Sequence, residues 1–490
     1  MKAPCARTVS MRFAPLLMRC GTALGWQPEK MVRNHNIWPL SKGFSQVNQK
    51  GRFLNLNVGI NTTGYLPEAW RYRTGSSADI TDPAYYRALT ELAHTGLFDA
   101  AFLSDHPALM TEATGRPFHT LDPLMLTTHL AAQVPDIGFV ATMSSTYNSP
   151  YNLARRTQSA DILSGGRLIV NIVTSFNRDV AANFGNAPLP PRSERYARAL
   201  EFMDVAKALW ASWDRSREQA VPENRFWDAS AARTIDHTGP YFSVRGPLNV
   251  PRGPQGYPVI AQAGASAGGI ELAARHGEII YCNILCRQAG IDFRARVAER
   301  ARAAGRDPAG IRIVPGVVVI LGATRQEAFR RHELYTGAGS EDGLIARFIK
   351  EHGFAPDTFN ADAILDPKHF LPPSDRLQAL GMGLGLYDLL THEKLTARQV
   401  VRRSAGHHRL LLGTPEDVAD GLIDLWQDGT VDGYTLQPPR APDDIVEFIQ
   451  KVIPILQDRG VYRRRYENST VRDRYGLPYP SASDTAGAYA

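Results

Sequence analysis

The chain repeats one structural unit, in which a short apolar run is followed by a polar turn and then by a helical pattern. In the first unit, apolar and polar residues alternate over residues 53–60 (FLNLNVGI), and the polar turn NTTG follows. This alternation predicts a β-strand that ends in a turn. A helix is then predicted over 82–96, because Asp82 can cap its first turn and Pro83 lacks the N–H that would be unpaired there.

Repetition of this unit predicts an α/β fold with eight strands that alternate with helices. Eight such strands favour a closed (β/α)8 TIM barrel over an open doubly wound sheet. The strands are mostly apolar throughout, as expected where both faces of a sheet are covered. The predicted strands cover residues 53–60, 100–103, 137–142, 168–174, 259–262, 278–282, 313–320 and 433–437. The predicted helices cover residues 82–96, 122–134, 151–163, 193–213, 267–276, 287–304, 416–428 and 442–457.

Two stretches interrupt the repeat and are predicted to be insertions in the barrel. Residues 214–257, after the fourth strand, are rich in Pro, Gly and Arg, and residues 336–411, after the seventh, contain helical fragments. Long insertions in compact domains often form lids or binding loops, so residues 214–257 are a candidate lid. In the second insertion, His407 and His408 are interpreted as solvated or interface residues.

The charge of the chain is concentrated before the first strand. The formal net charge is +6, yet residues 1–52 contain nine Lys or Arg and one acidic residue, so the rest of the chain carries −2. This distribution gives no support for a nucleic-acid-binding face. The basic extension 1–52 is expected to be disordered, with the composition either of a transit peptide or of a stretch before a true start at Met31. A single barrel domain is predicted over residues 53–476, with a flexible tail over 477–490.

The composition is that of a globular protein. The 490 residues, of which 43% are apolar, are enough to bury a large core. No window approaches the ~18 consecutive apolar residues of a membrane span. Four cysteines are too few for a disulfide scaffold and favour a reduced, cytoplasmic location. Cys282 and Cys286 have no second pair with which to bind zinc and are expected to pack in the core.

Candidate chemistry is expected at the carboxyl ends of the strands, where barrel enzymes have their active sites. The residues there are polar and mostly neutral, and HExxH, lysine-containing phosphate loops and nucleophile elbows are absent. His106 is either a ligand contact or part of a structural turn. Trp70, after the first strand, either covers a planar ligand or caps the barrel mouth. The residues that follow the strands include Asn61, Asp105, Thr142, Ser175, Asn283 and Gln437.

The turn after the fifth strand predicts an anion site. Residues 262–269 (QAGASAGG) lead from the strand directly into a helix. Small residues let backbone N–H groups and the positive end of the helix approach an anion, and Ser266 adds a hydroxyl donor. Phosphate is the ligand that this turn would suit, although glycine-containing turns between a strand and a helix are common without one.

Seven sequence runs, in the expected order between residues 53 and 476, resemble one family. The chain is similar to the nitrilotriacetate and dibenzothiophene-sulfone monooxygenase branch of the bacterial luciferase-like flavin enzymes. The runs are FDAAFLSD (98–105), VATMSSTYNSPYNLARR (140–156), DILSGGRLIVNIVTS (161–175), NFG (183–185), RYARALEF (195–202), GPLNVPRGPQGYPVIAQAGAS (246–266) and GTPEDVAD (413–420).

The resemblance implies a (β/α)8 barrel that uses reduced FMN and dioxygen, with the reduced flavin supplied by a separate NAD(P)H-dependent flavin reductase. It places FMN contacts on Asp105, Thr142, Tyr196 and Ser266. Where the family often has a His four residues before this Tyr, the chain has Arg192, whose guanidinium could bind a phosphate through two parallel hydrogen bonds.

These features predict a two-component monooxygenase that acts on a small organic substrate, with no nucleic-acid or membrane partner and no bound metal. His106 and Trp70 are the candidates for catalytic contacts with the substrate. The family suggests a homo-oligomer. Three alternatives remain: a deazaflavin-dependent reductase of the same superfamily, a non-catalytic flavin-binding barrel, and a phosphosugar enzyme, for which Lys or acid pairs at the strand ends are missing.

Overall fold

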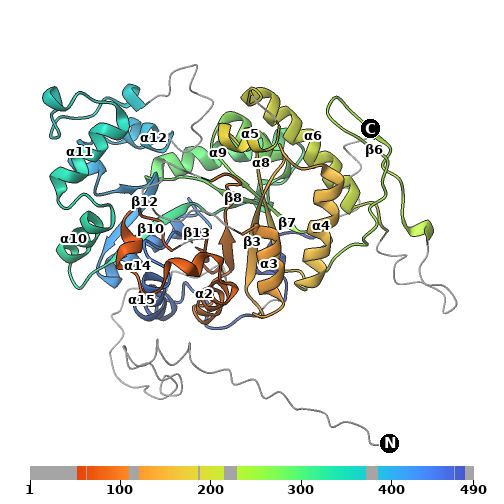
Figure 1. The fold of residues 1–490 in the computed structure, drawn as a ribbon, viewed down its shortest axis with the longest axis horizontal. Coiled ribbons are helices and arrows are strands. Elements are labelled where there is room, and N and C mark those ends of the chain that lie inside the picture. The colour runs from red at the N-terminus through yellow and green to blue at the C-terminus, as the bar shows by residue number, and fades with distance from the viewer. Residues whose placement is uncertain are drawn as a thin grey trace, which may run out of the picture. The chain divides into compact units, whose positions relative to one another are not determined.

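The computed structural model describes residues 52–61, 63–109, 121–185, 188–214, 229–370, 384–467 and 469–480. The predicted basic extension, except for Arg52, and most of the predicted tail lie outside these residues. Within them, one curled sheet has the strand order β11-β12-β10-β13-β1-β2-β3-β4-β7-β8-β9. Helices cover its outside, as in a luciferase-like TIM barrel (Figure 1).

The strands of the large sheet pair in parallel, apart from the short β11–β12 pair. They are β1 (Asn55–Gly59), β2 (Ala100–Leu103), β3 (Gly138–Ser144), β4 (Leu168–Val173), β7 (Val259–Ala263), β8 (Ile279–Tyr281), β9 (Arg312–Ile313), β10 (Gly316–Leu321), β11 (Ser404–Ala405), β12 (His408–Gly413) and β13 (Gly433–Leu436). A separate hairpin joins β5 (His237–Thr238) to β6 (Ser243–Val244).

The described helices alternate with the strands largely as the sequence predicts. They are α2 (Pro83–Thr95), α3 (Pro123–Ala131), α4 (Pro150–Leu163), α5 (Arg178–Asn183), α6 (Arg192–Trp210), α8 (Ala267–His276), α9 (Arg287–Ala303), α10 (Arg325–Tyr335), α11 (Glu341–His352), α12 (Leu384–His392), α13 (Ala397–Val400), α14 (Pro415–Gln427), α15 (Asp443–Lys451), α16 (Ile453–Asp458) and α17 (Val471–Arg474). None of the described helices is long and apolar enough to cross a bilayer.

The helix starts follow the capping signals in the sequence. The Asp82 carboxylate accepts a hydrogen bond from the N–H of Ala84 at the start of α2, and Asp122 does the same for Met125 at the start of α3. Pro occupies the first position of both helices. These predictions are confirmed because cap and proline act locally and need no tertiary partner.

Residues 312–321 connect two parts of the sheet. The N–H of Arg312 donates to the carbonyl of Glu278 over 2.8 Å, which joins this run to β8. On its other side, the carbonyl of Ile313 accepts from the N–H of Asp432 over 2.8 Å, which joins it to β13. The run therefore lies between β8 and β13, and β13 in turn pairs with β1.

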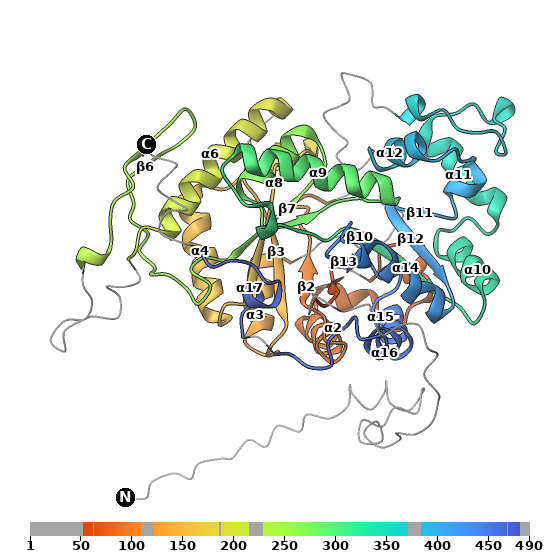
Figure 2. The same cartoon turned by 180° about the vertical axis from the view of Figure 1, so that it is seen from behind.

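The inward side chains of the sheet form an apolar cluster that includes Phe102, Val140 and Ile169. Val471 and Tyr475, in and just after α17, pack into the same cluster from the amino ends of the strands. Figure 2 shows α17 lying against this side of the sheet. The space between the strands is therefore filled at the amino ends, which leaves the carboxyl ends for a site.

Strand β12 corrects the prediction for the second insertion. Residues 408–413 pair in parallel with β10, from Val317 opposite Arg409 to Leu321 opposite Gly413. His408 is 2% exposed, so its interpretation as a solvated or interface residue is wrong. The sequence HHRLLL gives a polar start to a strand, and a neutral imidazole can be buried where a hydrogen bond satisfies it. His407 is exposed, as expected.

The C-terminal helical pattern over 442–457 forms two helices instead of one. The chain bends at Val452 between α15 and α16, and Pro454 lies in the first turn of α16. Proline has no N–H to continue the preceding helix, and its ring clashes with the carbonyl four residues earlier. The break therefore has a local cause that the apolar periodicity did not reveal.

The first insertion does not act as the predicted lid in its described part. The Glu201 carboxylate on α6 accepts hydrogen bonds from the N–H groups of Tyr241 and Phe242, at 3.1 and 2.9 Å. The Gln255 amide donates to Asp161 on α4 over 2.7 Å. Residues 229–257 thus pack against the outer helices, not over the strand ends.

The second insertion reaches the carboxyl end of the sheet through α12. A Cβ atom at Gly385 would lie 3.5 Å from atoms of both Asn283 and Leu285, which follow β8. Leu285 and Leu386 belong to one apolar cluster. Helix α12 therefore packs on the loop that follows β8.

Candidate active site

The turn after β7 forms a corner with α6. Ser266 is the N-cap of α8, and its hydroxyl accepts a hydrogen bond from the N–H of Gly269 over 3.2 Å. The Tyr196 hydroxyl, from α6, lies 3.3 Å from the Ser266 hydroxyl. A Cβ atom at Gly268 would lie 2.8 Å from the Tyr196 ring, so only glycine allows this approach. The structure thus brings together two residues that the sequence predicted as cofactor contacts.

Two arginines of α6 lie beside this corner. Arg192 is the first residue of the helix, and its guanidinium carbon is 5.6 Å from the centre of the Tyr196 ring. Arg195, which sequence reasoning missed, is 3% exposed and donates to the carbonyls of Thr174 and Ser175 at 2.7 Å each. Arg195 therefore fixes the end of β4 relative to α6. Together with the amino end of α8, the two guanidinium groups make this corner suitable for a phosphate.

Polar atoms on the inner face of the sheet fit a ligand that has hydrogen-bond donors. The Asn171 amide on β4 donates to the hydroxyl of Thr142 on β3 over 2.9 Å. Its carbonyl oxygen Oδ1 is buried, as is Oε1 of Gln262, and neither has a hydrogen-bond partner among the described residues. Buried acceptors are normally paired, so these two atoms point to a missing donor. The ring N–H and ribityl hydroxyls of FMN are such donors.

The loop after β2 places Asp105 at the same end of the sheet. Asn61, after β1, exchanges two hydrogen bonds with Ser104: its amide donates to the Ser104 hydroxyl over 2.8 Å and accepts from the Ser104 N–H over 2.6 Å. Burial, and to a smaller extent the charge of Asp122, raise the pKa of Asp105 to about 6. The half-buried carboxyl is therefore mostly protonated below pH 6 and mostly ionised above it.

The two predicted substrate contacts lie on different loops. His106 follows Asp105, and burial lowers its pKa, so the imidazole is neutral at pH 7 although Asp179 on α5 opposes the shift. Trp70 lies in a short helix after β1, η2 (Ala69–Tyr72), with the Arg71 guanidinium 4.5 Å from its ring centre. The indole Nε1 is buried and has no hydrogen-bond partner among the described residues. Neither role assigned to these residues is tested by the geometry.

Sequence reasoning missed a further polar group inside the sheet. The Tyr281 hydroxyl, at the end of β8, lies 2.9 Å from Nε2 of His408 on β12 and accepts from the Gln437 amide over 3.1 Å. Gln437 was expected at a strand end, whereas Tyr281 was not singled out and His408 was interpreted as a solvated or interface residue. Residues 279–282 (IIYC) have the pattern of an apolar strand. The hydrogen bond between Tyr281 and His408 forms only because β12 places His408 beside it.

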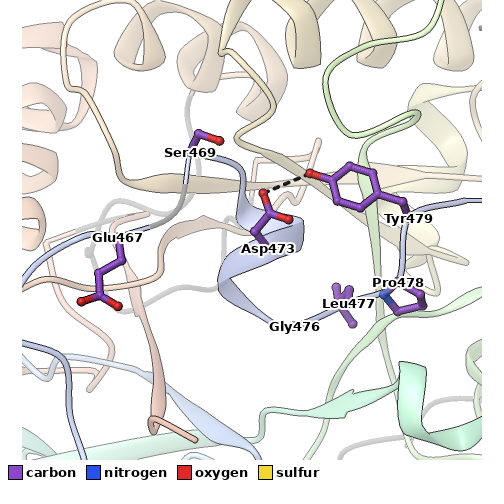
Figure 3. Close-up of a pocket in the computed structure, with 7 residues that line it drawn as sticks. All are labelled: Glu467, Ser469, Asp473, Gly476, Leu477, Pro478 and Tyr479. Carbon is purple, nitrogen blue, oxygen red and sulfur yellow. Dashed lines mark hydrogen bonds between the residues drawn. The ribbon is translucent and has the colours of Figure 1, made fainter. Parts of the chain in front are cut away.

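A surface hollow of about 520 Å³ lies at the opposite end of the strands. Figure 3 shows its lining around α17, where the Tyr479 hydroxyl donates to the Asp473 carboxylate over 3.0 Å. This hollow is separate from the residues described above, because α17 packs on the amino ends of the strands. It is lined by Glu467, Ser469, Asp473, Gly476, Leu477, Pro478 and Tyr479.

A curled parallel sheet, with a corner after β7 suited to an anion and a polar inner face at the strand ends, is typical of a cofactor-binding α/β enzyme of the barrel type. Residues 67–433 match the family described as luciferase-like monooxygenase, and the chain belongs to this family. The family resemblance in the sequence is therefore confirmed.

Similar proteins cover almost the whole chain. It is 33% identical over 438 residues to the N-acetyl-S-(2-succino)cysteine monooxygenase of Bacillus subtilis (strain 168), which covers 88% of this chain and 98% of that protein. It is 34% identical over 449 residues to nitrilotriacetate monooxygenase component A of Aminobacter aminovorans, with the same coverages of 88% and 98%. The EDTA monooxygenase of Chelativorans sp. BNC1 superposes with a TM-score of 0.77 at 38% identity, covering 87% of this chain and 99% of that one.

A more distant likeness shows the fold alone. The coenzyme F420-dependent tetrahydromethanopterin reductase of Methanopyrus kandleri superposes with a TM-score of 0.51 at 15% identity, covering 82% of this chain and 99% of that one. Enzymes with a different flavin thus share the architecture, so the architecture by itself does not select the cofactor.

Proposed function

We propose that this protein is the oxygenase component of a two-component flavin-dependent monooxygenase. It would take reduced FMN from a separate NAD(P)H-dependent flavin reductase and use dioxygen to oxygenate a small organic substrate. The observation that carries the proposal is the corner of Ser266, Tyr196 and Arg192 beside the unpaired acceptors of Asn171 and Gln262. The name of the relative called component A, which indicates a second component, supports the need for a reductase.

We also infer that the sheet closes as a (β/α)8 barrel with insertions after its fourth and seventh strands. Residues 312–321 would be the seventh strand, since they bond to β8 on one side and β13 on the other. The insertions would then be residues 214–257 and 336–407. Closure would place the carboxyl ends of all eight strands in one ring, which is where the candidate residues lie.

Each candidate residue has a distinct part in holding the flavin. Ser266, Arg192 and Tyr196 bind the phosphate, and Thr142 with Asn171 orients the polar edge of the ring. Asp105 faces the same edge from β2. When bound, the reduced flavin would supply the two electrons with which one atom of dioxygen is reduced to water while the other passes to the substrate. Trp70 and His106 contact the substrate and help to exclude water.

A deazaflavin-dependent reductase is the second candidate, and a non-catalytic flavin-binding barrel is the third. The monooxygenase names of relatives at 33–34% identity favour the first proposal, whereas the F420-dependent structure shares 15% identity. Titration with FMN and with F420 separates the first two, because only one of these flavins should bind tightly. A phosphosugar enzyme would need Lys or acid pairs at the strand ends, and the described strand ends offer no such pair to support it.

We infer a cytoplasmic location and a homo-oligomer. Cys282 and Cys286 are both buried free thiols, which a reducing compartment preserves. The NAD(P)H-dependent reductase would share that compartment. The homo-oligomer rests on the family resemblance.

The experiment that tests the function combines the purified chain with FMN, NADH and a flavin reductase. N-acetyl-S-(2-succino)cysteine, nitrilotriacetate and dibenzothiophene sulfone form the first substrate panel. The expected result is substrate consumption that requires both reductase and oxygen, with one atom of 18O from labelled dioxygen in the product. Consumption without oxygen would favour the reductase, and tight FMN binding with no turnover of a broadened panel would favour the non-catalytic barrel.

A further inference from the structure

Three hydrogen-bonded side chains lie at the strand-end site next to the proposed flavin contacts. The Tyr281 hydroxyl is 2.9 Å from His408 Nε2 and 3.1 Å from Gln437 Nε2, and these are its two partners among the described residues. The residues come from β8, β12 and the end of β13. The proposed flavin contacts come from the end of β2, from β3 and β4, from Gln262 on β7, and from the corner between α6 and α8.

The surroundings of His408 determine which ring nitrogen carries hydrogen. Burial lowers the pKa of His408 to about 3, so the ring is neutral and has one N–H. Its Nδ1 atom is buried with no hydrogen-bond partner among the described residues, and a Cβ atom at Gly316 would lie 2.6 Å from it. A buried N–H without an acceptor is rarer than an unsatisfied acceptor. The hydrogen therefore belongs on Nε2, which donates to Tyr281.

This tautomer leaves the Tyr281 hydrogen without an acceptor. A tyrosine hydroxyl has two acceptor lone pairs and one hydrogen. The N–H groups of His408 and Gln437 occupy both lone pairs, so the hydroxyl hydrogen must point elsewhere. Burial raises the pKa of Tyr281 well above its usual value, which keeps the hydrogen on the oxygen. The residue is nevertheless only partly buried by accessible surface.

We propose that Tyr281 is a specificity-determining residue whose hydroxyl donates a hydrogen bond to an oxygen acceptor of the substrate, such as a carboxylate or sulfone oxygen. His408 and Gln437 are positioning residues that turn this donor away from the protein. The Phe102 ring, 5.3 Å away between centres, holds the tyrosine ring from β2. The inference rests on the proposed function, because it takes the strand ends beside the flavin as the substrate site.

The tautomer is tested first, without any ligand. Nitrogen NMR of the full chain labelled with 15N-histidine, with His408→Phe to assign the signal, should show hydrogen on Nε2 of His408 from pH 6 to 8. Hydrogen on Nδ1 would mean that Tyr281 donates to His408, and this would overturn the proposal.

The donor is then tested by binding to the FMN-loaded, oxidised enzyme, which needs no turnover. The probes are nitrilotriacetate, dibenzothiophene sulfone and dibenzothiophene, whose ring system lacks the sulfone oxygens. Tyr281→Phe should weaken binding of an oxygen-bearing probe about tenfold and leave dibenzothiophene and FMN binding unchanged. Tyr434→Phe is the matched control, since it removes a buried hydroxyl that packs among the outer helices.

Three outcomes of the binding test would overturn the assignment. The first is equal binding of every probe to wild type and Tyr281→Phe, and the second is no binding of either oxygen-bearing probe to the wild type. The third is a parallel loss of FMN affinity in Tyr281→Phe, which would mean that the hydroxyl donates to the flavin. Probe binding is measured with oxidised FMN and needs neither a reductant nor oxygen. If the enzyme failed to oxygenate any substrate, that result would contradict the proposed function, but the binding measurement would still test the role of Tyr281.

Discussion

Individual side chains around the candidate site differ in how their charge is controlled. Asp105 is only half ionised near pH 6 because burial disfavours its charged form. His106 is neutral for the same reason. The permanent positive charges of Arg192 and Arg195 lie together at the Tyr196 corner. Among these residues, the Tyr196 corner is therefore the favourable place for a dianionic phosphate. The Asp105 carboxyl follows β2 and is not part of this corner.

Arg192→Ala should weaken FMN binding by about 1.5–3 kcal/mol, the usual loss for a hydrogen bond to a charged group. Fluorescence titration of FMN measures the change. Arg198→Ala is the control, because Arg198 lies on the same helix but packs over the Phe242 ring at 4.3 Å, on the side of the first insertion. Equal FMN affinities of wild type and Arg192→Ala would exclude Arg192 as a phosphate contact.

Asp105→Asn should make the stability of the protein less dependent on pH. The folded-state pKa of about 6 is above the ordinary 3.8, so the carboxyl favours the folded state at low pH and this contribution is lost as pH rises through 6. The advantage of Asp105→Asn over wild type in the free energy of unfolding should therefore grow by about 1 kcal/mol between pH 5 and pH 7.5. Urea unfolding at both pH values measures it, and a constant difference would contradict the raised pKa.

At the scale of elements, the site depends on the close approach of two helices. Helix α8 meets α6 through Gly268, which lies against the Tyr196 ring. The sequence predicted both helices and the small residues of the turn. The family resemblance predicted Tyr196 as a cofactor contact, but no local pattern showed that its ring faces the turn.

Gly268→Val should separate α8 from Tyr196 and weaken FMN binding at least tenfold. The added side chain would begin 2.8 Å from the base of the ring, which cannot move without moving α6. Gly310→Ala is the control, because a Cβ atom there would be 3.5 Å from Pro478, an ordinary contact. Unchanged FMN affinity in Gly268→Val, with circular dichroism like that of wild type, would show that the corner does not bind the phosphate.

At the scale of the whole molecule, the C-terminal segment supports the strands from their amino ends. The Arg472 guanidinium is fully buried and pairs with Glu278, which precedes β8. Arg463 pairs with Asp99, before β2, over 2.7 Å. The charged C-terminal segment can therefore be buried at the amino ends of the strands, because each of these buried arginines has a carboxylate partner.

Arg472→Met should lower the free energy of unfolding by about 3–5 kcal/mol, because it leaves Glu278 buried without its partner. The double variant Arg472→Met with Glu278→Gln should recover much of this loss. Chemical denaturation measures both, and FMN titration of the folded variants should be unchanged since the pair lies at the far end of the strands. A single variant as stable as wild type would contradict a structural role for the pair.

The sequence by itself determined most of the order of strands and helices, their caps and the family, and it predicted Ser266, Tyr196 and Arg192 as cofactor contacts. Those features depend on local periodicity, on turn and cap residues, and on motifs that are continuous in the chain. The tertiary structure decided that β12 lies beside β10, that the first insertion packs on α6, and that His408 meets Tyr281. These contacts join residues at least 40 positions apart in the chain, and no local pattern specifies such a pairing.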